Sequence, residues 1–179
     1  MLKTNRLTHF SPFRKNLLLI LSLTLVFLLS GCQNEETGKP LHIGDQAPDF
    51  TLTDMNGAKL HLREWAGSPV ILRFWSTDCK YCRADTPTFN DYFKRYSTQG
   101  LKVVYINSGA SHQDVTTFIK ELEIPFFVAM DQNGSVAARY KVKAVPQTIF
   151  IDPDQKIISA ILGGVGKAEL DELVGKYFH

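Results

Sequence analysis

Two cysteines, Cys79 and Cys82, lie three residues apart, directly after an apolar run and at the expected start of a helix. One helical turn brings two cysteines within disulfide range, and the positive end of the helix dipole stabilises a thiolate on the first of them. The pattern predicts thiol–disulfide exchange with both cysteines as catalytic groups. Cys79 would attack a substrate disulfide, and the more buried Cys82 would displace the reduced substrate and leave a Cys79–Cys82 bond.

Two alternatives to redox chemistry are a structural disulfide and half of a metal site. A disulfide that closes so short a loop constrains the unfolded chain little, so it would stabilise the fold weakly. A zinc site would need two more ligands. The histidines of the domain show no paired spacing: His42, His61, His112 and His179. We therefore expect no metal site and no cofactor, and we favour redox chemistry.

The elements that would position this pair alternate between strand and helix. Short apolar segments predict strands, and apolar residues at helical spacing predict helices. Residues 70–75 form the strand before the cysteines, and a helix with Pro87 inside it follows from about residue 79 to 96. The other expected elements are a loop at 41–50, a hairpin of strands 50–53 and 59–62, strands at 101–107 and 126–130, helices at 111–122, 134–140 and 167–178, and a hairpin of strands 148–152 and 156–161. Together they predict an α/β fold in which helices cover both faces of a central mixed β-sheet.

The third cysteine, Cys32, follows a segment typical of export. Residues 1–31 contain basic but no acidic residues, and the 13-residue apolar run 17–29 is shorter than the about 20 residues that span a bilayer. Leu29-Ser30-Gly31-Cys32 resembles the lipobox of bacterial lipoproteins, which implies cleavage before Cys32 and lipidation of its sulfur. We expect a signal peptide at 1–31, a lipidated tether at 32–40 and one domain at 41–179. The alternative is an uncleaved anchor in which Cys32 is incidental.

Both interpretations place the domain outside the cytoplasm and at a membrane, on the periplasmic side if the cell is Gram-negative. The chain of 179 residues has 20 basic and 18 acidic residues. Because four basic residues lie in 1–31, the remainder has 16 basic and 18 acidic residues and a net charge of −2. This balance excludes a strongly basic nucleic-acid-binding protein, so we expect no nucleic acid partner.

Several motifs besides the cysteine pair resemble the thioredoxin superfamily, and within it the TlpA/ResA-like lipid-anchored thiol-disulfide oxidoreductases. They are the N-terminal Gly44-Asp-Gln-Ala-Pro-Asp-Phe50, the strand from Val70 through Trp75 into the cysteines, Pro87 in the following helix, and Val142-Lys-Ala-Val-Pro146-Gln-Thr148. The resemblance covers nearly all of residues 41–179. It implies a thioredoxin-like fold, with the hairpin at 50–62 as an added N-terminal β-hairpin.

The resemblance also implies a substrate-binding role for three residues. Pro146 would be cis and face Cys79, which would leave the backbone C=O and N–H of Val145 free for an extended substrate. Trp75 would lie beside the active site. Without the resemblance, Pro146 would be an ordinary trans proline, and Trp75 would fit the core as well as the site.

Three positions depart from the family's pattern. Asp78 stands where the family usually has Trp. Its carboxylate disfavours a thiolate on Cys79, whereas the ammonium group of Lys80 favours one. Alternatively, Asp78 and Lys80 are a solvated surface pair whose effects on Cys79 partly cancel. Arg73 stands where relatives carry Asn or a buried Asp. It would pair with a carboxylate, lower the pKa of the cysteines, or lie at the edge of the sheet with its charge in solvent, and we favour the edge position. Ala110 replaces an acidic residue of ResA-like members and cannot transfer protons.

The leading hypothesis is a membrane-anchored thiol-disulfide oxidoreductase that works as a disulfide reductase. Its partners would be protein disulfides or dithiols and a membrane thiol-electron carrier, and cytochrome c maturation is one plausible pathway. A peroxiredoxin-like peroxidase is a second hypothesis, although Leu72 stands where its motif needs proline. A non-catalytic copper or haem chaperone on the same fold is a third, although copper-handling relatives use a C-x-x-x-C spacing with a downstream histidine.

Overall fold

The computed structural model describes residues 40–178. The predicted signal peptide, Cys32 and the tether up to residue 39 lie outside the described residues. No helix among the residues that the structure describes is long and apolar enough to cross a membrane.

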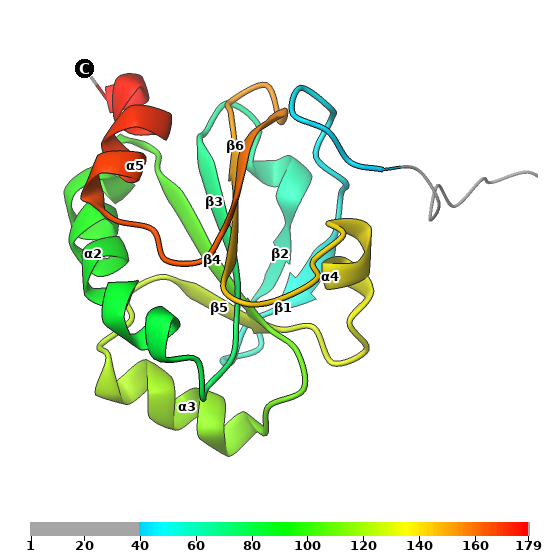
Figure 1. The fold of residues 1–179 in the computed structure, drawn as a ribbon, viewed down its shortest axis with the longest axis vertical. Coiled ribbons are helices and arrows are strands. Elements are labelled where there is room, and N and C mark those ends of the chain that lie inside the picture. Colours follow the sequence, from blue (N-terminus) through cyan, green and yellow to red (C-terminus); the bar gives the residue numbers. More distant parts are fainter. Residues whose placement is uncertain (1–39, 179) are drawn as a thin grey trace, which may run out of the picture. The chain divides into compact units, whose positions relative to one another are not determined.

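A five-stranded mixed sheet forms the centre of the domain (Figure 1). Its strands are β3 (Val70–Trp75), β4 (Lys102–Asn107), β5 (Phe127–Met130), β6 (Gln147–Ile151) and β7 (Ile157–Leu162). They lie in the order β5-β4-β3-β6-β7, in which β3, β4 and β5 are parallel and β6 and β7 are antiparallel to their neighbours. All six residues of β3 are buried, because this central strand is covered on both faces.

Helices cover both faces of the sheet. The helices are α2 (Lys80–Tyr96), α3 (His112–Glu121), α4 (Ser135–Arg139) and α5 (Lys167–Leu173). Buried side chains of α2, α3 and α5 share one core cluster, whereas those of α4 join a second cluster with the N-terminal hairpin. The predicted α/β class, mixed sheet and helix-covered faces are therefore confirmed.

The N-terminal hairpin pairs β1 (Thr51–Thr53) with β2 (Lys59–His61). Asp54 Oδ1 accepts hydrogen bonds from the N–H groups of Asn56 and Ala58, which fixes the turn. Gly57 has a φ of 88°, a value that favours glycine. The structure thus confirms the hairpin that the Asn-Gly pair predicts.

The closing helix is shorter than predicted. We expected one helix over 167–178, but α5 ends at Leu173 and a 3-10 turn, Gly175–Phe178, follows. Gly175 packs so closely on Tyr92 that a Cβ there would lie 2.9 Å from the hydroxyl oxygen. Two further 3-10 turns, Leu62–Trp65 and Ser97–Gln99, carry no apolar periodicity that would have predicted them.

Candidate active site

Cys79 and Cys82 form a disulfide at the start of α2, with their Cα atoms 5.2 Å apart. Cys79 is the N-cap residue in extended conformation, and its Sγ accepts a hydrogen bond from the Cys82 N–H at 3.1 Å. Cys82 is fully buried, whereas Cys79 is partly exposed. The first sulfur can therefore be reached from solvent at the positive end of the helix dipole, and the second is held beneath it.

Asn107 fixes the backbone on which the cysteine loop begins. It ends β4, pairs with Trp75 at the end of β3, and is fully buried. Its side chain donates to the Trp75 carbonyl at 3.2 Å and accepts from the Ala110 N–H at 3.1 Å. The ends of two parallel strands and the loop after β4 are thereby joined below the site.

Val145 and Pro146 precede β6, and the peptide bond between them is cis. Gln147 at the start of β6 pairs antiparallel with Phe74 near the end of β3. The Val145–Pro146 loop and the cysteine loop therefore leave the sheet at the same end. Val145 is 41% exposed, and no hydrogen bond engages its backbone within the described part of the chain.

Trp75 lies in the core and not on a substrate-facing surface. It is 1% exposed, shares a core cluster with Cys82, and packs against Phe118 at a ring centroid distance of 4.2 Å. A substrate-contacting role needs exposed surface, which this side chain does not present. Trp75 instead supports the cysteine loop from below.

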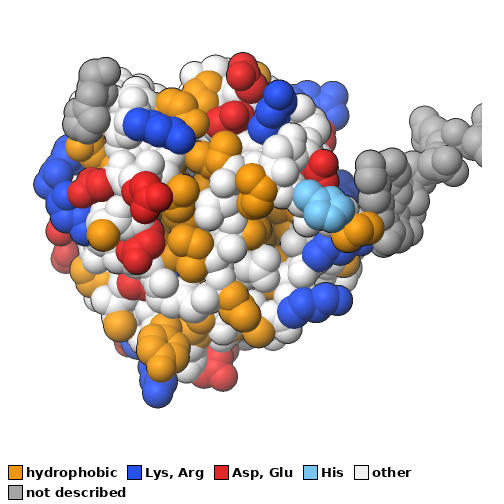
Figure 2. All heavy atoms as spheres, turned by 45° about the horizontal axis from the view of Figure 1, so that its top comes forward, with side chains coloured by type: hydrophobic (Ala, Val, Ile, Leu, Met, Phe, Trp, Pro, Cys, Tyr) orange, Lys and Arg blue, Asp and Glu red, His pale blue; other side chains and the backbone are white. Residues whose placement is uncertain are grey.

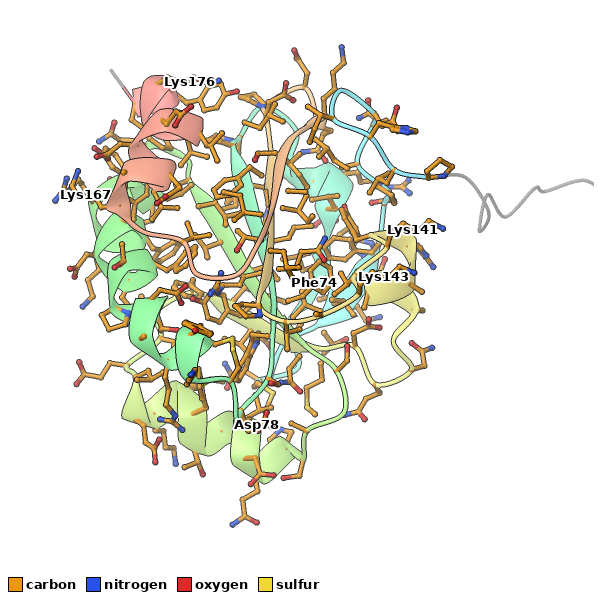
Figure 3. The ribbon with its side chains drawn as sticks, in the orientation of Figure 1. Phe74, Asp78, Lys141, Lys143, Lys167 and Lys176 are labelled. Atoms are coloured by element: carbon orange, nitrogen blue, oxygen red, sulfur yellow. A yellow bond between two sulfur atoms is a disulfide. The ribbon has the colours of Figure 1, made fainter. Side chains whose placement is uncertain are left out.

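Asp78 and Lys80 lie on either side of Cys79 in the sequence, and both are exposed. Figure 3 shows Asp78 at the end of the domain where α2 begins, away from Lys141 and Lys143 beside α4. The Ser76 hydroxyl donates to Asp78 Oδ1 at 2.7 Å, and this hydrogen bond lowers the pKa of Asp78. The Asp78 carboxylate is therefore ionised at neutral pH. The Lys80 Nζ atom lies 5.0 Å from the centre of the Tyr81 ring.

The expected edge position of Arg73 is wrong. Arg73 lies in the central strand β3, and its side chain is fully buried. Its Nη2 atom lies 2.5 Å from Asp85 Oδ2, and its Nη1 donates to Thr148 Oγ1 at 2.5 Å. A buried guanidinium needs a counter-charge, and Asp85 supplies it, as in the carboxylate-pairing alternative.

Asp85 is a site residue that sequence reasoning missed. It lies on α2, three residues after Cys82, and its side chain is 12% exposed. Burial raises the pKa of Asp85, while Arg73 and the Val165 N–H, which donates to Oδ2 at 3.0 Å, oppose that rise. The sequence does place Asp85 on the same face of the helix as Cys82. It does not indicate that Asp85 pairs with Arg73, 12 residues earlier on another element.

The AhpC/TSA family matches residues 43–160 of this chain. The chain belongs to this thioredoxin-like family. It is 34% identical over 176 residues to thiol-disulfide oxidoreductase ResA of Bacillus cereus (strain ATCC 10987 / NRS 248), with 98% of each chain covered. It is 33% identical over 120 residues to ResA of Bacillus subtilis (strain 168), with 67% of each chain covered.

The fold is similar to that of a solved thiol:disulfide interchange protein. A crystal structure from Chlorobium tepidum, described as a thiol:disulfide interchange protein DsbE, has a TM-score of 0.72 and 30% identity and covers 78% of this chain and 100% of that one. The chain is therefore a ResA-like thiol-disulfide oxidoreductase with a thioredoxin-like fold, as the sequence motifs predict.

Proposed function

We propose that this oxidoreductase is a membrane-anchored disulfide reductase that acts outside the cytoplasm, with Cys79 as the attacking residue and Cys82 as the resolving residue. The observation that carries the proposal is the pairing of a partly exposed cysteine with a fully buried one at the first turn of α2. That arrangement suits a nucleophile that meets the substrate and a second thiol that meets only the mixed disulfide.

The exchange proceeds in two balanced steps. The Cys79 thiolate attacks one sulfur of a substrate disulfide, the substrate S–S bond breaks, and the other substrate sulfur leaves as a thiolate that takes up a proton. Cys82 then loses its proton and attacks the Cys79 sulfur, which releases the second substrate thiolate. The substrate gains two electrons, and the Cys79–Cys82 pair loses them.

The substrate would be an extended protein segment with apolar side chains near its disulfide. Tyr81, between the two cysteines, is 56% exposed, and Val145 is 41% exposed, which makes both available for apolar contact. The backbone of Val145 could pair with an extended chain in the manner of an added strand. Figure 2 shows charged side chains of both signs among hydrophobic ones on the face it presents.

The local charge favours the reducing direction. The ionised Asp78 carboxylate next to Cys79 destabilises a thiolate there and thus destabilises the reduced form of the pair. Lys80 acts in the opposite sense, but its ammonium group lies over the Tyr81 ring. A pair whose reduced form is destabilised gives up its electrons more readily.

The membrane anchor would be a lipid on Cys32 after cleavage of residues 1–31, with 32–40 as the tether of the domain 41–179. A membrane thiol-electron carrier would return electrons to the oxidised pair, and cytochrome c maturation is the pathway we propose for its clients. Cell fractionation tests the anchor: the full chain should partition with membranes, and Cys32→Ser should release it or leave it uncleaved.

The other two hypotheses have less support. Leu72, where a peroxidase motif needs proline, is a fully buried residue of the central strand. Within residues 40–178 there is no group of three or more His, Cys, Asp or Glu side chains that could hold a metal ion. We therefore retain disulfide reduction as the function.

Variants of the two cysteines test the mechanism. In an assay of insulin reduction by dithiothreitol, Cys79→Ser and Cys82→Ser should each lose the protein's catalysis. Cys82→Ser should also accumulate a mixed disulfide through Cys79, because the resolving thiol is gone. Cys32→Ser is the matched control and should retain turnover, whereas full turnover without Cys82 would contradict the proposed mechanism.

A further inference from the structure

A short exposed segment leads into the cis peptide bond. Residues 143–145 are all exposed, and the fold holds this segment at both ends. Val142 packs against the core cluster of the N-terminal hairpin, and its N–H donates to the Ala137 carbonyl at 2.9 Å. Pro146 is buried, and its carbonyl accepts from the Gly163 N–H at 2.8 Å. The place of the segment at the end of the sheet is therefore fixed on both sides.

Lys143 gives this segment a positive charge. Its side chain is exposed, and no salt bridge engages it within residues 40–178. Residues 132–151 contain no acidic residue and three basic ones, which are Arg139, Lys141 and Lys143. Residues 32–179 as a whole contain more acidic than basic residues. The positive charge before the cis bond is thus a local feature and not a property of the whole domain.

Lys143 lies within reach of a substrate chain that pairs with Val145. An extended chain advances by at most about 3.6 Å per residue, so the Cα atoms of these two residues are at most about 7 Å apart. A substrate that runs along Val145 as an added strand would place a residue opposite Lys143, about two positions further along. The ammonium group on its flexible four-carbon stem can meet a carboxylate there.

The two sides of the site differ in charge. On the cysteine side, Asp78 and Lys80 are both exposed and have opposite signs. On the other side, the segment 143–145 carries only the charge of Lys143, and Figure 3 shows Lys143 apart from Asp78. A substrate carboxylate would therefore meet attraction on one side and largely cancelling charges on the other.

We propose that Lys143 is a specificity-determining residue that selects substrates with an acidic residue about two positions from the reacting cysteine, on one side of it only. The inference rests on the proposed function, because it assigns a contact to the substrate that Cys79 attacks. Lys143 takes no part in the transfer of electrons or protons. It acts by raising the rate at which an acidic substrate segment is captured, and salt should weaken this effect by screening the charges.

Three matched peptides test the proposal with the reduced domain. Each holds one cysteine in a disulfide with 2-mercaptoethanol and carries Glu two positions before it, Glu two positions after it, or Gln at both positions. The second-order rate constant of reduction is divided by that for dithiothreitol, which corrects for the reactivity of the peptide itself. We expect one Glu peptide to react about threefold faster than the Gln peptide at low salt, and this advantage to disappear at high salt.

Charge variants assign the preference to Lys143. Lys143→Gln should abolish the advantage of that Glu peptide, and Lys143→Glu should reverse it to a disadvantage of about threefold. Lys176→Glu is the matched control, because it makes the same charge change on an exposed residue. Lys176 lies in the turn after α5, and α5 and α4 cover opposite faces of the sheet (Figure 3). This control should keep the wild-type preference.

Two results would overturn the proposal. The first is a wild-type preference that Lys143→Glu leaves unchanged. The second is an equal response to Lys143→Glu and Lys176→Glu, which would assign the preference to the net charge of the domain.

The Gln peptide separates this inference from the proposed function. A reduced wild-type domain that leaves all three peptides oxidised would contradict the function itself. A domain that reduces all three at equal relative rates would contradict only the role of Lys143.

Discussion

Single residues decide how readily Cys79 forms a thiolate. Asp78 and Lys80 precede and follow it in the sequence, and both are exposed. The sequence supplied the identity and opposite signs of these charges. It could not supply the Ser76 hydrogen bond that lowers the pKa of Asp78 or the contact of Lys80 with Tyr81, because both depend on side-chain directions at the helix start.

A pair of charge-removing variants tests the contributions of these neighbours. Asp78→Asn should lower the pKa of Cys79, and Lys80→Gln should raise it, because each removes one neighbouring charge. Both charges are exposed and screened by solvent, so we expect the Cys79 alkylation rate below its pKa to change by only about twofold to fivefold, in opposite directions. Equal effects of the same sign would show that the helix start had rearranged.

At the scale of elements, the ends of β3 and β4 hold the cysteine loop. The strands themselves were predictable from their apolar runs, and so was the helix that starts at the cysteines. The link between the strand ends was not, because an asparagine at the end of the predicted strand 101–107 gives no local sign of its hydrogen-bond partners. Its role depends on the parallel register that places it opposite Trp75.

Loss of that link should weaken the fold. Asn107→Ala would leave the Trp75 carbonyl and the Ala110 N–H without their partner, and a buried polar group left unpaired costs about 1–3 kcal/mol. We expect the free energy of unfolding in urea to fall by about 2 kcal/mol. Asn56→Ala, in an exposed turn, is the matched control and should change it by less than about 0.5 kcal/mol. A similar loss in both variants would assign no special role to Asn107.

At the scale of the whole domain, the fold class could be predicted but the placement of Arg73 could not. Alternating strands and helices, the Asn-Gly turn and the family motifs all agree on one architecture. Arg73 was placed at an edge because a buried charge is costly. The compensating carboxylate lies on another element, and only the packing of α2 against β3 brings the two together.

The redox state should change the stability of the whole domain. A cysteine pair is strongly reducing when the folded protein is more stable with the disulfide than with the dithiol, because the folded protein then gives up its two electrons readily. We therefore expect the oxidised domain to have a larger free energy of unfolding than the reduced one, by about 1 kcal/mol or more. Urea unfolding of both forms measures it. A reduced form that is the more stable would identify an oxidant and contradict the proposed direction.

Both outer strands of the central sheet are partly capped by the segment that precedes β3. Asp54 bridges to Ala129 on the outer side of β5, and the Gly44 N–H and the Asp45 C=O bond to Ile157 on the outer side of β7. Unpaired strand edges are templates for intermolecular pairing and aggregation. Residues 41–61 should therefore reduce pairing of the outer strands with a second copy of the chain. This would matter most if the proposed lipid anchor concentrates the protein on a membrane surface.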